Sequence, residues 1–546
     1  MIELTRSRPR PALPVGLRVP VLLTVMVVVA IGAPLCLAVG TGSISIPHND
    51  AWSYSAISQN FARTGDIHLL GWNRGALIGQ LVLVGPLGRW LALQQLTVAC
   101  LGVAAVVITY RLVASHAGRS AGVLAAGLVM FFPGYALLAT SFMEDVPAYF
   151  ATVACLALGE RAFRLGSQTY LVLALLIGVW GCTVREQVIA APLAVIAAIA
   201  WRERNSRLAR WQLGGAAVVL LALFAIFELW RSQLANADLA SIQLAAPKAF
   251  LLKSFRAYYT LALVVSPAVL AGIRRSSLTR RQWLASGVIG LVECVLILAY
   301  SHARGFLGGN LAAAGPYSVA HNGTHPVLAS PVIAFLEILA LASGAVLPIL
   351  VLNGWRRLGP ILSIFGVFTI AGTLLEIEVG QSVFDRYLIS LVPVVVITVG
   401  PFAGSSARLR AVAGTAILAG VSLALAASAL ALDAAEWRAG QALVRAGVAP
   451  ADIDAGFAWV GYHATTPADQ RRLTTNPSDP FYLALFVHSR DCIAVSVSPL
   501  PSGRVVRTIR YRTFGVVGTS RLYITNTGKC AESAALDATI RTLPGS

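Results

Sequence analysis

Long, uninterrupted apolar runs recur along this sequence and limit what it can fold into. A helical run of roughly 20 apolar residues crosses the hydrocarbon core of a bilayer. Strands of a membrane barrel would instead alternate polar and apolar residues over about 10 positions. The sequence therefore predicts an α-helical polytopic membrane protein with about thirteen transmembrane helices. The predicted spans are residues 19–40, 91–113, 120–140, 146–160, 168–183, 188–201, 211–230, 257–273, 283–300, 331–352, 359–378, 386–402 and 410–432.

The charges of the chain are few and unevenly placed. Only 12% of the residues are charged and 57% are hydrophobic, whereas about 25% of a soluble chain is charged. The net charge of +18 comes from Arg residues in short loops between apolar runs, which is the positive-inside pattern of membrane proteins. No basic stripe interleaved with aromatic residues occurs, so the charge does not indicate a nucleic-acid partner.

The same Arg residues predict the orientation. With the N-terminus inside, every inner loop carries at least two Arg residues and the outer loops carry few. We predict a multi-pass cell-membrane protein with a cytoplasmic basic N-terminus at residues 1–18 and a transmembrane domain at 19–432. Its first outer loop is 41–90, and 433–546 form an extracytoplasmic C-terminal domain. The first run lacks a small-residue cleavage site, so we interpret it as an uncleaved anchor.

The C-terminal tail differs in composition from the rest of the chain. Short β-like stretches at 492–497 and 520–525 are separated by turn residues, which predicts a small α/β or mostly-β domain. Outside the cytoplasm, Cys492 and Cys530 can form a disulfide; two free thiols are the alternative.

The first outer loop contains a helical pattern next to a carboxylate. Tyr54, Ile57 and Phe61 recur at helical spacing within residues 50–63, and Gly65 ends the pattern. We expect a short amphipathic helix lying on the membrane surface. Asp50, beside Asn49 at its start, either caps this helix or acts as a general base on an acceptor hydroxyl.

Three further polar groups lie at predicted outer ends of spans, where each is costly and therefore informative. Glu144 and Asp145 make a tight turn; they either cap the next helix or orient an acceptor, bind a cation or pair with Arg. Arg185 either pairs with Glu186 or snorkels to the interface, or it binds phosphate or holds Asp145. Arg386 either pairs with Asp385 or binds phosphate.

Carboxylates and arginines around one outer cavity suit the transfer of a sugar from a lipid-linked phosphate. Arg would bind the phosphate and stabilise it as a leaving group. A carboxylate would take the proton of the attacking hydroxyl. One such displacement inverts the anomeric configuration and needs no nucleotide.

These motifs resemble the GT-C glycosyltransferases, in particular the protein O-mannosyltransferase and aminoarabinose-transferase-like branch. The resemblance covers roughly residues 20–430 and lies in the order of the motifs along the spans. The matching pieces are Asn49–Tyr54 followed by Thr64–Gly65 and Gly71–Trp72, then Phe142–Pro147, Arg185–Gln187, and Arg386–Leu388 before Pro393.

The resemblance implies a polyprenyl-phosphate sugar donor and an extracytoplasmic active site. It implies that Asp50 is the catalytic acid of the first loop, that Asp145 is similar to the second acid, and that Arg386 binds phosphate. Members often carry two consecutive acids in the first loop, and Ala51 stands in the second position here. We therefore expect no required cofactor and no metal ligands, and a divalent cation is disfavoured.

We predict an inverting, polyprenyl-phosphate-sugar-dependent glycosyltransferase that acts on an extracytoplasmic envelope glycan, lipid or protein. Asp50 would be the base, Glu144, Asp145 and Asn49 would orient the acceptor, and Arg386 with Arg185 would bind the donor phosphate. Two alternatives stay open, a transporter or flippase of a lipid-linked saccharide and a non-catalytic envelope-assembly protein. A transporter would need polar residues along a path through the bilayer, whereas here they concentrate on one face.

Overall fold

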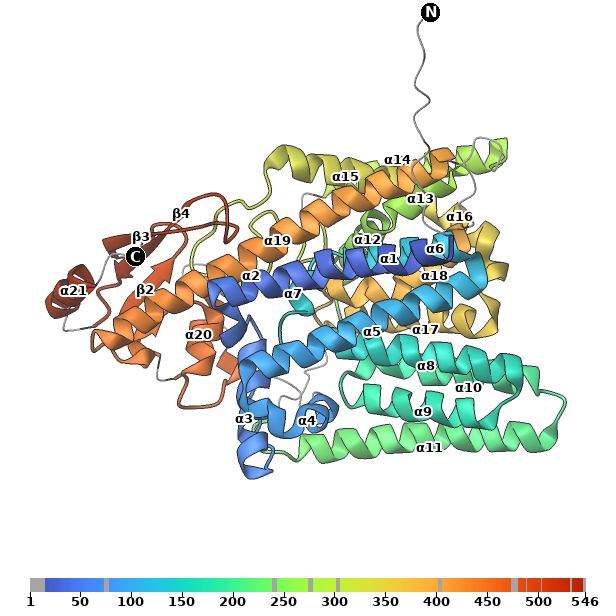
Figure 1. Cartoon of the computed structure of the whole chain (residues 1–546), viewed down its shortest axis with the longest axis horizontal. Helices are drawn as coiled ribbons and strands as arrows, with labels where there is room; N and C mark the ends of the chain where they lie inside the picture. The colour runs from blue at the N-terminus through green and yellow to red at the C-terminus, as the bar shows by residue number, and fades with distance from the viewer. Residues whose placement is uncertain are drawn as a thin grey trace, which may run out of the picture.

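The computed structural model describes residues 15–72, 78–237, 243–273, 278–300, 305–400, 405–472, 480–487, 489–501, 503–530 and 533–543. It is mostly helical, with one small sheet near the C-terminus (Figure 1). The helices are α1 Val15–Val27, α2 Ala33–Thr41, α3 Ala51–Thr64, α4 Ile78–Val84, α5 Leu91–Ala117, α6 Arg119–Met130, α7 Tyr135–Leu138, α8 Asp145–Leu165, α9 Gln168–Cys182, α10 Ala190–Arg202, α11 Arg207–Ser232, α12 Pro247–Val264, α13 Ser266–Gly272, α14 Arg280–Ala299, α15 Ser330–Gly344, α16 Leu347–Gly354, α17 Gly359–Glu378, α18 Val392–Val399, α19 Ser405–Arg445, α20 Phe457–Tyr462 and α21 Ser533–Thr542.

The chain is a multi-pass membrane protein. Among the described residues, seven helical segments are long and apolar enough to cross a bilayer, and the pair α12 and α13 makes an eighth if it is one bent span. Several of these helices expose large apolar side chains, such as Val218 and Leu229 on α11 and Leu284 and Leu298 on α14. Large exposed apolar surfaces are costly in water, so these helix faces are suited to contact with lipid.

Each of the thirteen predicted spans lies on one or more helices, but several are not single straight helices. Residues 120–140 are divided between α6 and α7, and α12 meets α13 at an angle of 64°. The break between α12 and α13 falls at Val265, and Pro267 in the first turn of α13 cannot continue the hydrogen-bond ladder of α12. The apolar pattern located the helices correctly, and thirteen as the number of crossings stays a prediction.

The predicted inner loops gather at one end of the helices. Arg164 at the end of α8 donates to Ser115 near the end of α5 over 3.4 Å, and Arg202 at the end of α10 donates to the carbonyl of Phe163. The C-terminal domain lies at the opposite end (Figure 1). Which end faces the cytoplasm stays a prediction, and residues 1–14 of the predicted basic N-terminus lie outside the described residues.

The C-terminal domain contains a four-stranded sheet in the order β1-β2-β4-β3. Its strands are β1 Ile453–Asp454, β2 Ile493–Ser496, β3 Arg504–Tyr511 and β4 Ser520–Asn526. The two predicted strands are therefore present as β2 and β4, which pair antiparallel. Cys492, just before β2, and Cys530, just after β4, form a disulfide across their ends.

α19 joins the membrane domain to the C-terminal domain without a break. Its 41 residues give a helix roughly 60 Å long at 1.5 Å per residue, about twice the thickness of a hydrocarbon core. The predicted boundary at 432–433 lies inside this helix. The C-terminal half of α19 therefore extends beyond the bilayer and carries α20 and the sheet with it.

α20 packs tightly on α3, the helix of the first outer loop. The indole of Trp52, which is 1% exposed, meets the rings of Phe457 and Phe486 edge-on at 5.9 and 5.7 Å. Gly461 of α20 lies directly over the same indole, and a Cβ at this position would collide with it. The C-terminal domain thus braces the helix that begins immediately after Asp50.

We expect Gly461→Ala to destabilise this contact, because a methyl group would overpack the Trp52 indole. Overpacking of this kind costs about 1–3 kcal/mol, so the melting temperature of the detergent-purified protein should fall. Gly420→Ala in α19 is the matched control, since nothing lies within 4 Å of its Cβ position. Equal melting temperatures for the two variants would contradict the docking of α20 on α3.

Candidate active site

Four motifs that are far apart in the sequence meet at the ends of the helices nearest the C-terminal domain (Figure 1). Asp50 immediately precedes α3, and Asp145 begins α8. Arg185 follows α9, and Arg386 lies in the short 3-10 helix Asp385–Leu391 that leads into α18. The structure therefore brings the predicted carboxylates and guanidinium groups into one cluster.

Asp145 is at the centre of this cluster. One of its oxygens, Oδ1, accepts a hydrogen bond from Nη1 of Arg185 and lies 3.1 Å from Nε of Arg386. Its second oxygen, Oδ2, is buried and has no hydrogen-bond partner among the described residues. Asp145 therefore fixes both guanidinium groups and keeps one oxygen available for a ligand.

Asp50 lies on the other side of Arg386. Its Oδ2 is 3.9 Å from Nη2 of Arg386, and its Oδ1 accepts a 2.9 Å hydrogen bond from the indole nitrogen of Trp72. Burial raises the pKa of the Asp50 carboxyl above its ordinary value, while Arg386 and Trp72 act in the opposite direction. A carboxylate with a raised pKa is a stronger base, as proton abstraction requires.

Glu144 pairs with the other guanidinium group. Its Oε1 lies 3.4 Å from Nη1 of Arg185, and its carboxylate accepts a hydrogen bond from the Tyr54 hydroxyl. Burial raises the pKa of Glu144 above its ordinary value, although Arg185 favours the ionised form. Glu144 and Asp145 thus both pair with Arg185.

Aromatic rings hold the two guanidinium groups in place. The guanidinium carbon of Arg185 lies 4.2 Å from the ring centre of Tyr387, and that of Arg386 lies 4.3 Å from the ring centre of Phe384. Such contacts contribute roughly 0.5–2 kcal/mol each, more when water is excluded. They orient the guanidinium planes without using their N–H donors.

Several of the local contacts considered for these motifs are absent among the described residues. Neither Asp50 nor Glu144 makes a capping hydrogen bond to the helix that follows it. Asp145 lies in the first turn of α8, but its Oδ1 faces Arg185 and Arg386. Glu186 pairs with Arg231 at 2.7 Å, while Arg185 turns to Asp145.

Asp385 holds the backbone around Arg386 in place. Its carboxylate accepts hydrogen bonds from the backbone N–H groups of Asn310 and Leu311 at 2.8 and 2.7 Å, and from the side chain of Asn310 at 3.0 Å. It also accepts from the backbone N–H of Arg386 at 2.7 Å. Asp385 therefore ties the loop before α15 to the turn that carries Arg386.

A cavity of about 440 Å³ adjoins the cluster. Asp145, Arg185 and Arg386 line its polar part, and α10, α11 and α17 supply apolar walls. Phe368 and Leu375 of α17 line the cavity and are 37% and 62% exposed on the surface of a candidate span. The cavity thus connects a pair of guanidinium groups with a lipid-facing surface.

Gln187 of the Arg185–Gln187 motif and Glu376 of α17 lie along the same cavity. Gln187, two residues after Arg185, donates to both oxygens of Glu376 on α17 at 2.8 and 3.0 Å, and both side chains line the cavity. This contact joins the turn after α9 to α17. Glu376 had no motif to identify it, and only the packing of α17 beside this turn assigns it to the site.

Two predicted site residues, Asn49 and Asp50, do not line the cavity beside Arg386. Asn49 has a left-handed backbone, with φ of 45°, and lines a separate small cavity beside His321. Asp50 does not line the large cavity and reaches it only through Arg386.

Sequence patterns did not assign a role to Trp72 or Tyr387. Trp72 donates to Asp50, and Tyr387 supports Arg185, as described above. Both residues stand within the recognised motifs, but an aromatic residue near an interface is also typical of a membrane-protein belt. Their roles depend on which way each ring faces, and spacing along the chain does not encode that.

Comparison with known proteins finds similarity at the level of solved structures. No protein-family model matches the chain, and no curated protein matches its sequence. ArnT from Cupriavidus metallidurans in the apo state aligns with a TM-score of 0.41 and 14% sequence identity, covering 95% of this chain and 99% of ArnT. ArnT bound to undecaprenyl phosphate aligns with a TM-score of 0.39, 13% identity and the same coverage. The solved structures similar to this chain thus include ArnT.

Proposed function

We propose that this protein is an inverting membrane glycosyltransferase that moves a monosaccharide from a polyprenyl-phosphate donor to an extracytoplasmic glycan, lipid or protein. The observation that carries the proposal is the meeting of Asp50, Asp145, Arg185 and Arg386 at the polar part of a cavity with apolar walls. Such a site fits a ligand with a phosphate group at one end and a hydrocarbon chain at the other.

The donor would bind with its phosphate between the two guanidinium groups. Both carboxylate contacts of Arg185 run through Nη1, and a guanidinium group has five N–H donors in all. Donors other than Nη1 can therefore approach a phosphate while Asp145 holds the group in place. The polyprenyl chain would leave along α17, past Phe368 and Leu375, into the bilayer.

The reaction would be a single displacement at the anomeric carbon. Asp50 takes the proton of the acceptor hydroxyl, whose oxygen forms a new bond to the anomeric carbon. The bond from that carbon to the phosphate oxygen breaks, and the oxygen keeps the electron pair. Arg185 and Arg386 stabilise the negative charge that develops on the phosphate. The products are the glycosylated acceptor and polyprenyl phosphate.

The two substrates would reach the reacting carbon from different sides. The donor occupies the cavity, and Asp50 stands beyond Arg386, outside the cavity lining. An acceptor hydroxyl beside Asp50 would therefore face the anomeric carbon from the side opposite the phosphate. Inversion requires this geometry.

Transfer of radiolabelled sugar from a set of polyprenyl-phosphate monosaccharides by purified protein tests the proposal. We expect one donor to support transfer to an envelope extract in detergent. Movement of a labelled lipid across a vesicle membrane without any transfer would favour a flippase instead. Neither transfer nor movement would favour a non-catalytic assembly protein.

The Trp72–Asp50 hydrogen bond predicts a shift in the pH dependence of transfer. Asp50 must be ionised to act as a base, so activity falls as the pH drops through its pKa. Trp72→Phe removes a hydrogen bond that stabilises the carboxylate, which raises the pKa of Asp50 further. We expect the acid limb of the kcat/KM profile to move upward by about one to two pH units, since one hydrogen bond to a charged group contributes roughly 1.5–3 kcal/mol.

Trp90→Phe is the control for this shift, because Trp90 lies in the same outer segment and is 55% exposed. Its acid limb should coincide with that of the wild type. An unchanged limb in Trp72→Phe would mean that a group other than Asp50 controls the acid side of the profile.

A further inference from the structure

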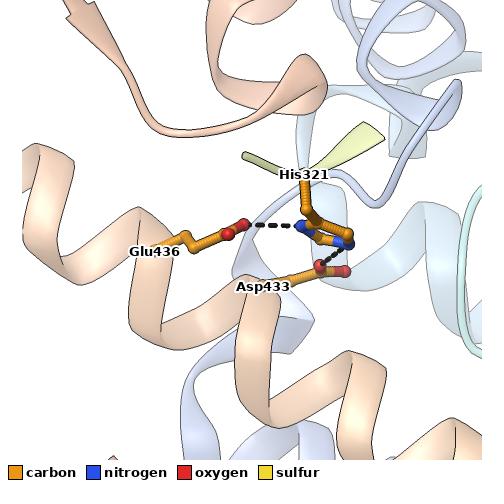
Figure 2. Close-up of side chains that lie close together, drawn as sticks. All are labelled: His321, Asp433 and Glu436. Atoms are coloured by element: carbon orange, nitrogen blue, oxygen red, sulfur yellow. Dashed lines mark hydrogen bonds and ion pairs between the residues drawn. The ribbon is translucent and has the colours of Figure 1, made fainter. Parts of the chain in front are cut away.

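A second cluster of ionisable side chains lies outside the candidate active site. His321 comes from the loop between α14 and α15, and Asp433 and Glu436 lie one helical turn apart on α19. Nδ1 of His321 is 2.8 Å from Oε2 of Glu436, and its Nε2 is 3.6 Å from Oδ1 of Asp433 (Figure 2). One nitrogen or oxygen atom from each residue lies within 4.8 Å of the others.

A neutral His321 ring would have one N–H too few for its two carboxylate contacts. Each of its ring nitrogens faces a carboxylate, and a neutral imidazole carries only one N–H. Both contacts can be favourable only if the ring takes a second proton or if a cation stands between the ring and the carboxylates. The cluster therefore calls for a positive charge, either a second proton on the ring or a bound cation.

A small cavity provides the space for it. The cavity measures about 20 Å³ and is lined by His321, Asp433, Glu436 and Tyr317, among other residues. Roughly 10–15 Å³ of such space is enough for one water-sized particle. The cavity can therefore accept a single ion beside all three side chains.

A buried polar atom at this cavity, Oε1 of Glu436, has no partner among the described residues. Glu436 is 3% exposed, so bulk water does not satisfy this atom. A buried polar atom without a partner costs about 1–3 kcal/mol, and a ligand in the cavity would remove that cost.

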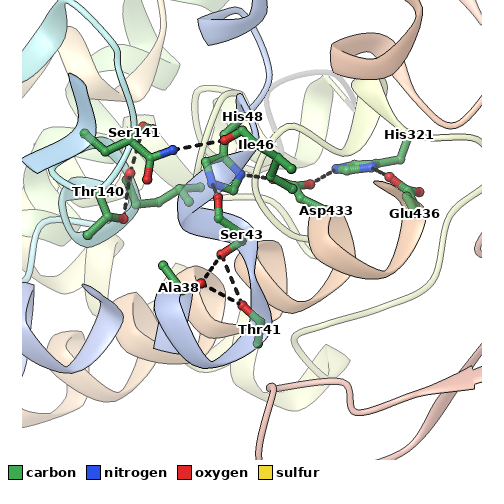
Figure 3. Close-up of polar contacts among 12 residues, drawn as sticks. Ala38, Thr41, Ser43, Ile46, His48, Thr140, Ser141, His321, Asp433 and Glu436 are labelled. Carbon is green, nitrogen blue, oxygen red and sulfur yellow. Dashed lines mark hydrogen bonds and ion pairs between the residues drawn. The ribbon is translucent and has the colours of Figure 1, made fainter. Parts of the chain in front are cut away.

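A further histidine orients one of the carboxylates. Nδ1 of His48 lies 2.5 Å from Oδ2 of Asp433, and its Nε2 lies 3.1 Å from the carbonyl oxygen of Ser43 (Figure 3). The contact leaves the other oxygen of Asp433 directed at His321. Hydrogen-bonded partners of this kind fix the carboxylates of metal sites in position.

We propose that His321, Asp433 and Glu436 form a structural site for a divalent cation, with zinc as the ion that fits best. One imidazole nitrogen and two carboxylates are common zinc ligands, and a tetrahedral ion leaves one position for water. The two negative charges of the carboxylates balance the two positive charges of the ion. The sequence-based expectation was that this chain has no metal ligands.

The site would join three parts of the chain that surround the candidate active site. It connects the loop before α15 with α19, and through His48 it reaches the segment that ends in Asp50 two residues later. The ion would therefore stabilise the position of the first outer loop. This inference does not depend on the chemistry proposed for Asp50.

Metal analysis of the full-length protein tests the site. The protein is purified without a histidine tag, incubated with zinc, passed through a desalting column and analysed by mass spectrometry for bound metal. We expect about one zinc ion per chain in the wild type, and close to none in the double variant Asp433→Asn/Glu436→Gln. The amide side chains are similar in size but are poor zinc ligands.

His116→Ala is the matched control, because His116 forms a similar pair with Glu160 at 3.6 Å far from this site. It should keep the zinc ion. EDTA should lower the melting temperature of the wild type and of this control, but not that of the double variant. Cobalt added to the EDTA-treated wild type should give the visible absorption of a tetrahedral site, a readout that needs no variant.

A wild type without stoichiometric zinc and with a melting temperature unaffected by EDTA would overturn the proposal. In that case a protonated His321 would be the positive charge between the two carboxylates. Zinc retained in full by the double variant would also overturn it, since the ion would then be bound elsewhere.

Discussion

Asp50→Asn should lower the turnover of sugar transfer by about 10²- to 10⁴-fold, the range that general-base catalysis contributes. The amide cannot take a proton from the acceptor hydroxyl. It retains an oxygen that can accept the 2.9 Å hydrogen bond from Trp72, so the loop should keep its conformation. The measurement is kcat with saturating donor and acceptor, together with the melting temperature.

Asp66→Asn is the control for this loss. Asp66 lies in the same outer loop but is exposed, and the same chemical change there should leave turnover unchanged. Turnover that survives Asp50→Asn would remove Asp50 as the base. A similar loss in both variants would indicate a general effect of charge in the outer loop.

Arg386→Lys should lower kcat/KM for the donor by about 10²- to 10³-fold, comparable with the loss of one donor that stabilises a developing negative charge. The Arg386 guanidinium spans Asp50 and Asp145 at 3.9 and 3.1 Å, and a lysine ammonium is a point charge that cannot keep this planar geometry. Both kcat and the KM for the donor should change, because Arg386 would contact the phosphate before and during bond breaking.

Arg256→Lys in α12 provides the comparison. Arg256 is partly buried and donates from Nε to the carbonyl of Phe306 at 3.1 Å, but it does not line the cavity. Its substitution tests the effect of replacing a partly buried arginine without touching the site. If Arg386→Lys changes only the melting temperature and leaves kcat/KM intact, Arg386 has a structural role and does not bind the donor phosphate.

Local patterns in the sequence were sufficient to predict most secondary structure. Tyr54, Ile57 and Phe61 predicted α3, and Gly65 ends it with φ of 80°. The apolar stretches of β2 and β4 were also recognised. β3 was not, because Arg504, Arg507 and Arg510 interrupt its apolar residues and the segment does not resemble a buried strand. Each successful prediction depended on residues within a few positions of one another.

The sequence also predicted that the candidate site residues lie on one side of the membrane. Asp145, Arg185 and Arg386 each stand at an end of an apolar run and Asp50 lies in the loop after the first run, so the alternation of spans put all four on the same side. That inference needed only an even number of membrane spans between each residue and the next. It could not give the distances between the side chains, since those depend on how the helices pack.

Only the tertiary structure decided which of these charges touch. Asp145 pairs with both guanidinium groups, whereas its neighbour Asp50 in the cluster contacts Arg386 and Trp72. Lone charges at an apolar boundary are costly, so each one must find a partner. Several pairings would satisfy that requirement, and the packing of α3, α8 and α18 selects one.

The apolar runs by themselves determined that this chain is a helical membrane protein, because no other fold buries so much apolar sequence. The cavity beside Arg386 and the cluster of His321, Asp433 and Glu436 were determined only by the tertiary structure. Metal spacing was absent from the sequence because His321 and α19 are far apart along the chain. Their approach depends on the long helix α19 extending beyond the bilayer and packing against the outer loops.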